Sequence, residues 1–208
     1  MTNLTAMNPI RFNEEEDAPC KESEKDAKGP VPFEAQLLET RTILIYGEIN
    51  QKLAQEVTSK LLVLSSKSDD DITIIINSQG GHVESGDTIF DMIRYVKPRV
   101  KIVGTGWVAS AGALIFAAAD KENRFCLPNT RFMLHQPSGG VGGQASDISI
   151  EAQEILKMRA RLNETFHQQT GQSIERIEHD TDRNFWMTAE EAKAYGLVHK
   201  IIKKATEL

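Results

Sequence analysis

The stretch ITIIINSQGGHVESGDTIFDMIRYV, residues 72–96, contains one complete unit of the predicted fold. It opens on a run of isoleucines, which is typical of a buried strand. Two glycines follow, and apolar residues then recur at three- and four-residue spacing, which predicts an amphipathic helix that Pro98 ends. A strand, a glycine turn and a helix in this order indicate an α/β protein with a largely parallel sheet.

Patterns of the same kind stand on both sides of this unit. TILIYG (residues 42–47) and VKIVGTG (residues 100–106) are rich in β-branched residues and predict two more strands. QKLAQEVTSKLLVLSS (residues 51–66) has helical periodicity, and a further helix is expected from residue 110 to about residue 119. The alternation predicts one α/β domain over residues 31–208.

The second half of this domain contains the longest helical pattern, residues 146–170, with Ser146 as the expected N-cap. It is preceded by RFMLHQP, a strand that should end at His135, and by the glycine-rich SGGVGGQAS. The helix is longer than a small domain needs, so part of it should project and pack on another subunit.

The last segment combines a helix and a strand. TAEEAKAYG predicts a helix with a capping box of Thr188 and Glu191, closed by Gly196. LVHKII predicts the final strand.

Residues 1–30 have a different composition from the domain. EEEDAPCKESEKDAK (residues 14–28) is charged and nearly free of apolar residues, so it cannot bury enough surface to offset its ordering entropy. We expect a mobile leader, with a cleaved propeptide as the alternative.

Charge and cysteine content narrow the class of protein. The net charge of −6 argues against a nucleic-acid or anionic-membrane partner. Cys20 and Cys126 form neither a disulfide framework nor a zinc spacing, which indicates a reducing compartment. The chain shows no signal-peptide pattern and no apolar run long enough to cross a bilayer, so we expect a cytoplasmic protein.

Ser110 stands alone among small and apolar residues in WVASAGALIF, residues 107–116. At the start of a helix it lies near free backbone N–H groups, which could stabilise an oxyanion. An ordinary N-cap is the more common role for an isolated serine. The flanking alanines and glycines weaken that interpretation, because a cap does not need room for a substrate backbone.

The glycine turn NSQGG, residues 77–81, allows backbone conformations that point N–H groups outward. A phosphate-binding loop is disfavoured, because the P-loop lysine and the G-x-G-x-x-G spacing are missing. An oxyanion hole fits better, and a plain strand-to-helix turn remains the alternative.

His135 is the histidine most suited to catalysis, since functional groups of α/β folds gather at the carboxyl ends of strands. The other four histidines lie in helical or turn segments with polar neighbours. They are His82, His167, His179 and His199. Ser110 and His135 supply a nucleophile and a general base, the minimum for acyl transfer. From the residues alone, the hypothesis is a serine hydrolase.

Four blocks taken together resemble the proteolytic subunit of the Clp protease family over about residues 35–203. They are INSQGG, GWVASAGA, RFCLPNTRFMLHQPSGGVGGQASDI and TGQSIERIEHDTDRNFWMTAEEAKAYGLV. The resemblance implies the α/β spiral of β-β-α units shared with crotonases, with a projecting handle at about residues 136–170. It also implies a serine endopeptidase that encloses its active sites in stacked heptameric rings and binds no cofactor, while a separate AAA+ ATPase uses ATP to supply unfolded polypeptide.

The same resemblance implies roles for individual residues. Ser110 matches the nucleophile and His135 the general base, while the backbone N–H groups of Gly81 and Ala111 match the oxyanion hole. The resemblance also implies that a glycine-rich strand at residues 139–144 belongs to the handle and lines the substrate groove. The groove is implied at four consecutive positions: Gly139, Gly140, Val141 and Gly142.

The chain departs from the family at the third catalytic position, where Asn184 replaces the usual aspartate. An amide can accept the Nδ1–H bond but brings no negative charge. Asp182 is a rival for this role, because it would face the same side of an extended segment.

Two further departures affect assembly. The charged leader replaces an apolar one, and the unfoldase-docking pocket has Thr73 and Ile75 at positions that are often tyrosine, while Tyr95 and Phe125 keep aromatic character. These changes suggest a divergent paralogue, in homo-oligomeric rings or in mixed rings with a standard subunit. The alternatives are a weakly active or regulatory ring subunit and, more remotely, a crotonase-like enzyme that binds acyl-CoA.

Overall fold

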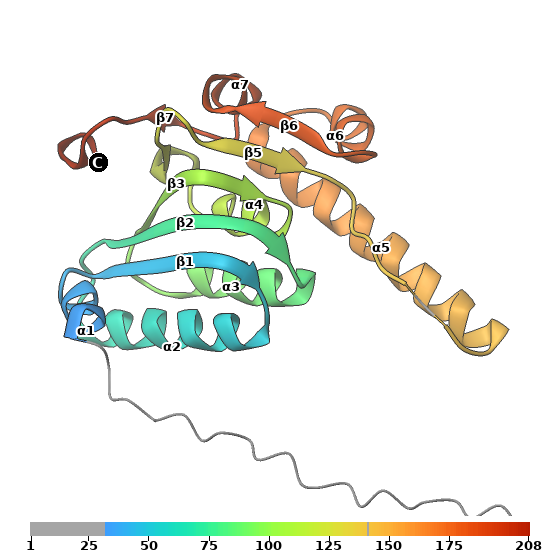
Figure 1. Ribbon diagram of the computed structural model, residues 1–208, viewed down its shortest axis with the longest axis horizontal. Coiled ribbons are helices and arrows are strands. Elements are labelled where there is room, and N and C mark those ends of the chain that lie inside the picture. Colours follow the sequence, from blue (N-terminus) through green and yellow to red (C-terminus); the bar gives the residue numbers. More distant parts are fainter. Residues whose placement is uncertain (1–31, 141) are drawn as a thin grey trace, which may run out of the picture. The chain divides into compact units, whose positions relative to one another are not determined.

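Parallel strands form the centre of the molecule, which the computed structural model describes for residues 32–140 and 142–208 (Figure 1). The parallel part of the sheet runs in the order β1 (Thr42–Ile49), β2 (Ile72–Gly81), β3 (Val100–Ala109), β4 (Arg124–Cys126) and β7 (Lys200–Ile201). Three helices connect the first four of these strands: α2 (Gln51–Lys67), α3 (Val83–Tyr95) and α4 (Ala111–Phe116). The prediction of an α/β fold with a largely parallel sheet is confirmed.

Strand β3 has two partners along the same edge. Its residues 102–104 pair with β4, and its residues 107–109 pair with β5 (Arg131–Leu134). Strand β6 (Phe185–Thr188) then pairs with β5 in antiparallel fashion, from Arg131 with Thr188 to Leu134 with Phe185. This arrangement brings together the ends of β3 and β5 and the start of β6, where Ser110, His135 and Asn184 stand.

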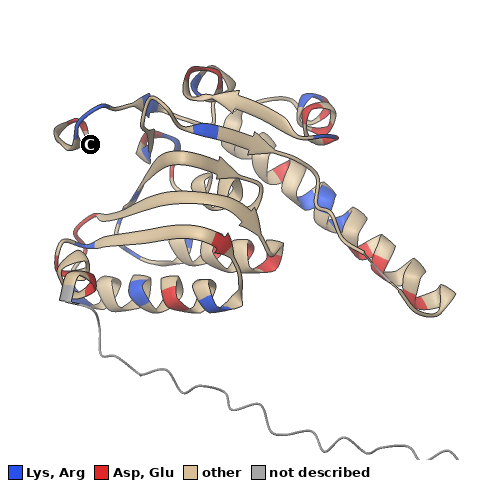
Figure 2. Cartoon of the chain, viewed as in Figure 1, with Lys and Arg blue, Asp and Glu red and all other residues tan. Residues whose placement is uncertain are grey.

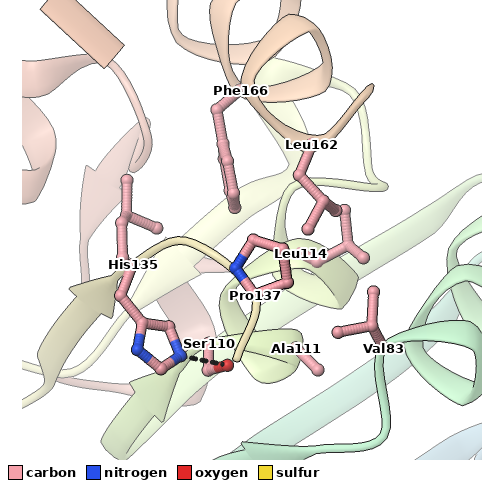
Figure 3. Close-up of a pocket in the computed structure, with 9 residues that line it drawn as sticks. Val83, Ser110, Ala111, Leu114, His135, Pro137, Leu162 and Phe166 are labelled. Atoms are coloured by element: carbon pink, nitrogen blue, oxygen red, sulfur yellow. Dashed lines mark hydrogen bonds between the residues drawn. The ribbon is translucent and has the colours of Figure 1, made fainter. Parts of the chain in front are cut away.

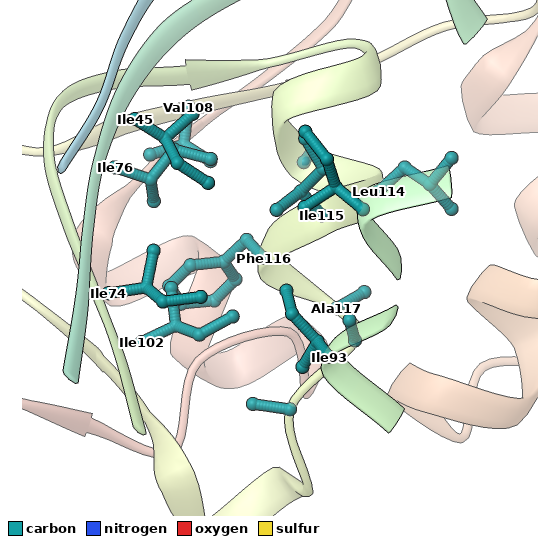
Figure 4. Packing of buried hydrophobic residues seen from close by; sticks show 14 of the residues in the cluster. Ile45, Ile74, Ile76, Ile93, Ile102, Val108, Leu114, Ile115, Phe116 and Ala117 are labelled. Carbon is teal, nitrogen blue, oxygen red and sulfur yellow. The ribbon is translucent and has the colours of Figure 1, made fainter. Parts of the chain in front are cut away.

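The hydrophobic core lies between the sheet and the helices α3 and α4. Figure 4 shows strand residues on one side and helix residues on the other. Phe116 of α4 and Phe132 of β5 meet edge to face, with ring centroids 5.1 Å apart. This packing fixes α4 against β5, and therefore fixes Ser110, just before α4, relative to His135, just after β5. The labelled core residues are Ile45, Ile74, Ile76, Ile102 and Val108 opposite Ile93, Leu114, Ile115, Phe116 and Ala117.

Helix α5 (Ala145–Thr170) extends away from the sheet (Figure 1). At 1.5 Å per residue its 26 residues span about 39 Å. Its C-terminal part buries Leu162 and Phe166, whereas its N-terminal half exposes Ile148, Ile150 and Leu156. An amphipathic helix with an uncovered apolar side is consistent with the expected projection.

The remaining elements lie around this frame. They are α1 (Pro32–Glu39), α6 (Ile174–Thr181), α7 (Ala189–Tyr195) and the 3₁₀ turns η1 (Lys121–Asn123) and η2 (Ala205–Glu207). The capping box of Thr188 and Glu191 is confirmed, as is the left-handed Gly196 that ends α7. The helix expected from residue 110 is shorter than predicted, and LVHKII forms a strand only at Lys200–Ile201.

Two local predictions about the handle are wrong. Helix α5 begins at Ala145, with Gln144 in the N-cap position, so Ser146 is inside the first turn. Gly143, with φ +140°, directly precedes this N-cap, and the helix starts two residues earlier than the capping signal suggested. The strand expected at residues 139–144 is not formed by residues 139–140 and 142–144, because an isolated strand leaves its backbone groups unpaired. Val141 and the leader at residues 1–30 lie outside the described residues.

Charged residues of both signs lie along α2 and α5 (Figure 2). Across the described ranges, no helix is long and apolar enough to cross a membrane.

Candidate active site

Ser110 occupies a strained backbone conformation between β3 and α4, with φ 55° and ψ −122°. A positive φ is rare for a residue with a side chain and is retained only where the surrounding structure enforces it. Its main-chain N–H donates to Met133 O at 2.8 Å, and its carbonyl accepts bonds from Ala113 and Leu114. The side chain makes no capping bond, so the interpretation of Ser110 as an ordinary N-cap is wrong.

The hydroxyl of Ser110 instead faces His135 (Figure 3). Ser110 Oγ lies 2.7 Å from His135 Nε2, and His135 Nδ1 lies 3.1 Å from Asn184 Oδ1. Because an amide oxygen can only accept, this contact assigns the proton to Nδ1 and leaves the Nε2 lone pair for the serine hydroxyl. The three residues therefore form a chain in which the serine can lose its proton to a neutral imidazole.

Asp182 does not take the place of Asn184. Its carboxylate Oδ1 lies 3.3 Å from Gln136 Nε2 and 3.5 Å from the guanidinium of Arg159. The segment is not a regular strand at this point, so the two-residue spacing does not bring Asp182 onto the same side as Asn184.

Gly80 lies directly against the serine and was not singled out from the sequence. A Cβ atom at this position would be 2.6 Å from Ser110 Cβ, and Gly80 also has φ +100°. The turn is braced by Ser78, whose hydroxyl accepts from Gly80 N at 3.0 Å and donates to Gly47 O at 2.6 Å. The double glycine was the available signal, because both residues lie in conformations that favour glycine.

The expected oxyanion-hole residues, Gly81 and Ala111, directly follow Gly80 and Ser110 in the sequence. Gly81 ends β2, and a side chain there would collide with Ile49 O. Ala111 is the first residue of α4, so its N–H belongs to the donors that a helix start leaves without an intrahelical partner. Of the expected groove residues, Gly139, Gly140 and Gly142 are exposed.

A small apolar pocket opens beside Ser110 (Figure 3). Its free volume of about 20 Å³ is close to that of one water molecule. Leu162 and Phe166 of α5 form one wall, and sequence reasoning missed them because they follow the serine by more than fifty positions. Their i, i+4 spacing was the signal. The complete lining is Val83, Ser110, Ala111, Leu114, Leu134, His135, Pro137, Leu162 and Phe166.

The carboxylate of Asp180 in α6 is buried, and it lies close to the site in sequence but separate from the triad. The carboxylate of Asp180 accepts bonds from Arg176, from His179 Nδ1 at 3.1 Å and from Tyr195 Oη at 3.1 Å. Burial raises the pKa of Asp180, but the bonds from these three residues outweigh burial and hold that pKa below its usual range.

The positions expected to form a docking pocket differ in exposure. Thr73 and Ile75 are half-buried on β2, and Tyr95 is exposed at the end of α3. Phe125 is buried in a small cluster with Val103, Ile202 and Leu208, in which side chains of the same chain cover it. Among the residues with described positions, no group of three or more His, Cys, Asp or Glu side chains could hold a metal ion.

The sequence of this chain is similar to those of known proteins over nearly its whole length. Residues 29–205 match the Clp protease family. The chain is 55% identical over 213 residues to ATP-dependent Clp protease proteolytic subunit 2 of Gluconobacter oxydans, a match that covers 99% of this chain and 96% of that one. It is 61% identical over 175 residues to proteolytic subunit 3 of Rhizobium meliloti, with coverage of 84% and 90%.

Solved structures agree with these relatives. ClpP1 from Listeria monocytogenes has a TM-score of 0.77 and 58% identity, over 85% of this chain and 99% of that one. An asparagine-to-aspartate mutant of the same ClpP1 has a TM-score of 0.79 and 59% identity, over 84% and 98%. The chain belongs to the Clp protease family, and it has the Clp protease fold that the resemblance implied.

Proposed function

We propose that this chain is a proteolytic subunit of a Clp-type protease, a serine endopeptidase that hydrolyses peptide bonds of unfolded proteins. One observation carries the proposal: Ser110 Oγ lies 2.7 Å from His135 Nε2, and Asn184 Oδ1 lies 3.1 Å from Nδ1 of the same ring. A nucleophile, a base and a group that orients the base are the parts that acyl transfer requires.

Each residue has a defined part in the reaction. Ser110 Oγ attacks the carbonyl carbon of the substrate while its proton moves to His135 Nε2, and the resulting imidazolium returns that proton to the leaving amine. Water then attacks the acyl-serine by the same route. The N–H groups of Gly81 and Ala111 would stabilise the oxyanion, a contribution of about 10²–10³ in kcat where it has been measured by removing one donor.

Asn184 sets the efficiency of this triad. Its oxygen orients the imidazole, but it cannot stabilise the imidazolium with a full charge. In trypsin-like enzymes the exchange of aspartate for asparagine lowers kcat by about 10⁴, whereas papain-like enzymes use asparagine beside a cysteine. We infer a weakened triad.

The apolar lining of the pocket next to Ser110 supports a preference for an apolar side chain before the scissile bond. The pocket volume of about 20 Å³ must widen to admit such a group, and the adjoining wall belongs to α5. The exposed segment with Gly139, Gly140 and Gly142 would hold the substrate backbone in an extended form.

We propose that the chain assembles into stacked heptameric rings, which family membership supports. The exposed apolar residues of α5 support its burial against another subunit. A partner AAA+ ATPase would use ATP, and this subunit would bind no cofactor. Homo-oligomeric and mixed rings remain alternatives, and the altered Thr73 and Ile75 favour a docking surface unlike the usual one. The buried free thiol of Cys126 fits a cytoplasmic location.

Hydrolysis of a fluorogenic peptide with an apolar residue before the scissile bond tests the proposal. Assembled protein should cleave it, and Ser110→Ala should reduce kcat to background. The expected loss is about 10²-fold, because removing the serine of a complete triad costs about 10⁶ and the asparagine already costs about 10⁴ of that. Ser138→Ala, an exposed serine near the site, is the matched control and should keep full activity. Equal rates for Ser110→Ala and the parent would disprove the proposal.

A further inference from the structure

Gln136 directly follows His135 and ties it to the segment that carries Asn184. Its main-chain N–H donates to Thr181 O at 2.6 Å. Its side-chain Nε2 donates to the main-chain oxygen of Asp182 at 2.8 Å and lies 3.3 Å from the carboxylate of the same residue. One residue therefore joins two stretches of chain through both its backbone and its side chain.

These bonds lie where the sheet ends. The β5–β6 ladder stops at the pair Leu134–Phe185, so His135 and Asn184 are the first residues beyond it. The ladder restrains this pair on one side, and Gln136 restrains it on the other. The same anchor extends to the projecting helix, because Asp182 is also 3.5 Å from Arg159 of α5.

The restraint that Gln136 places on His135 and Asn184 is important because the side chain of Asn184 is uncharged. A carboxylate would be attracted to the imidazolium as it forms and would find its own position, because charge-assisted bonds are about twice as strong as neutral ones. Asn184 is exposed and uncharged, and its contact with His135 Nδ1 is 3.1 Å long. Its position must therefore come from its surroundings.

We propose that Gln136 is a positioning residue that holds His135 and Asn184 at hydrogen-bonding distance, and that the reaction depends on it because the third triad member is an amide. This inference rests on the proposed function, through which it is measured. If Gln136 positions the asparagine in this way, replacing Gln136 should affect kcat less when a carboxylate stands at position 184.

A double-mutant cycle tests this dependence. Gln136→Met, which keeps the side-chain length and removes the donor, should lower kcat about 10- to 100-fold, because an error of about 1 Å at the reacting groups can cost 10²-fold. KM should change by less than about twofold, since the interaction acts on the chemical step. In the Asn184→Asp background the same change should lower kcat by less than about threefold.

Two variants separate positioning from other roles. Asp182→Ala removes the carboxylate but keeps the main-chain acceptor, so kcat should stay within about threefold, whereas a loss near 10⁴ would make Asp182 the third catalytic residue and overturn the proposal. Gln168→Met is the matched control, because Gln168 is an exposed glutamine on α5 that bonds to Glu164. It should change neither kcat nor KM.

The outcomes are distinct. Equal loss of kcat from Gln136→Met in both backgrounds, or no loss in either, would overturn the inference while leaving an active parent enzyme and the proposed function intact. An inactive parent in which Ser110→Ala changes nothing would instead overturn the proposed function. If Gln136→Met fails to assemble, Gln136→Glu, which has no donor for the Asp182 carbonyl, should give the same pattern of losses, and additive losses would again overturn the inference.

Discussion

Asp180 and Asn184 are the first and last residues of the short segment 180–184, yet their electrostatic surroundings are opposite. Asp180 is buried, charged and bonded to Arg176, His179 and Tyr195. Asn184 is exposed and neutral. Within the described part of the chain, its side chain makes one hydrogen-bonding contact, with the ring of His135. A full negative charge thus stabilises the fold at one position, while the triad works without one. The segment separates a structural carboxylate from a functional amide.

The largest expected effect comes from restoring the charge at the triad. Asn184→Asp should raise kcat, with about 10⁴ as the upper bound set by the reverse exchange in trypsin-like enzymes, because the carboxylate stabilises the imidazolium. Peptide hydrolysis by matched amounts of assembled protein measures it. Unchanged kcat would mean that geometry or assembly limits the rate, and the contrast between the two positions would lose its functional meaning.

The second effect is on stability. Asp180→Asn should lower the free energy of unfolding by about 2 kcal/mol, less than the 3–5 kcal/mol of a fully buried pair, because the side chain of Arg176 is 55% exposed. At about 2–4 °C per kcal/mol, Tm should fall by roughly 4–8 °C at fixed protomer concentration. Asp182→Asn, an exposed carboxylate, is the control and should leave Tm nearly unchanged. A Tm for Asp180→Asn equal to that of the parent would show that the cluster is not structural.

A smaller effect should appear in acid. The pKa of Asp180 is lower in the folded state than in the unfolded state, where it is about 3.9. The carboxylate therefore contributes to the free energy of unfolding above the unfolded pKa, and this contribution is lost as the pH falls through the folded pKa. The stability difference between the parent and Asp180→Asn should be constant from about pH 5 to 8 and shrink below about pH 4. Urea denaturation across this range measures it, and a difference that grows in acid would have the wrong sign.

The smallest expected effect is the reaction of a second nucleophilic group, the thiol of Cys126, with an alkylating reagent. Burial, together with Glu190, raises the pKa of Cys126 to about 12, so almost none of it is thiolate at neutral pH. Native protein treated with iodoacetamide at pH 8 should carry no label on the peptide that contains Cys126, whereas protein in urea should be labelled there. Rapid labelling of that peptide in native protein would show that nucleophilic reactivity is not confined to Ser110.

Much of the fold was predictable because its repeating units show strong periodicity, as in residues 72–96. The pairing of Ser110 with His135 also followed from the chain, since both residues stand at strand ends. Helices α1 and α6 were not predicted as elements; unlike α7, neither combines a capping box with a closing glycine. The division of β3 between β4 and β5 was also missed, because such pairing depends on contacts far apart in sequence.

The third member of the site shows where sequence reasoning stopped. Asn184 was identified through family resemblance alone, because an asparagine after an arginine has no chemical signature of its own. The different surroundings of Asp180 and Asp182 could not be read from DTDRN, since burial and bonding to Tyr195 or Gln136 depend on the packing of α6 against other elements.

The central claim is that the imidazole of His135 makes the hydroxyl of Ser110 a nucleophile, and covalent labelling measures this directly. Assembled protein should be treated with a fluorophosphonate probe and its peptides analysed by mass spectrometry. Ser110 should carry the label in the parent protein, and His135→Ala should abolish it. The absence of label on Ser110 in fully assembled protein, or equal labelling in the His135→Ala variant, would contradict it.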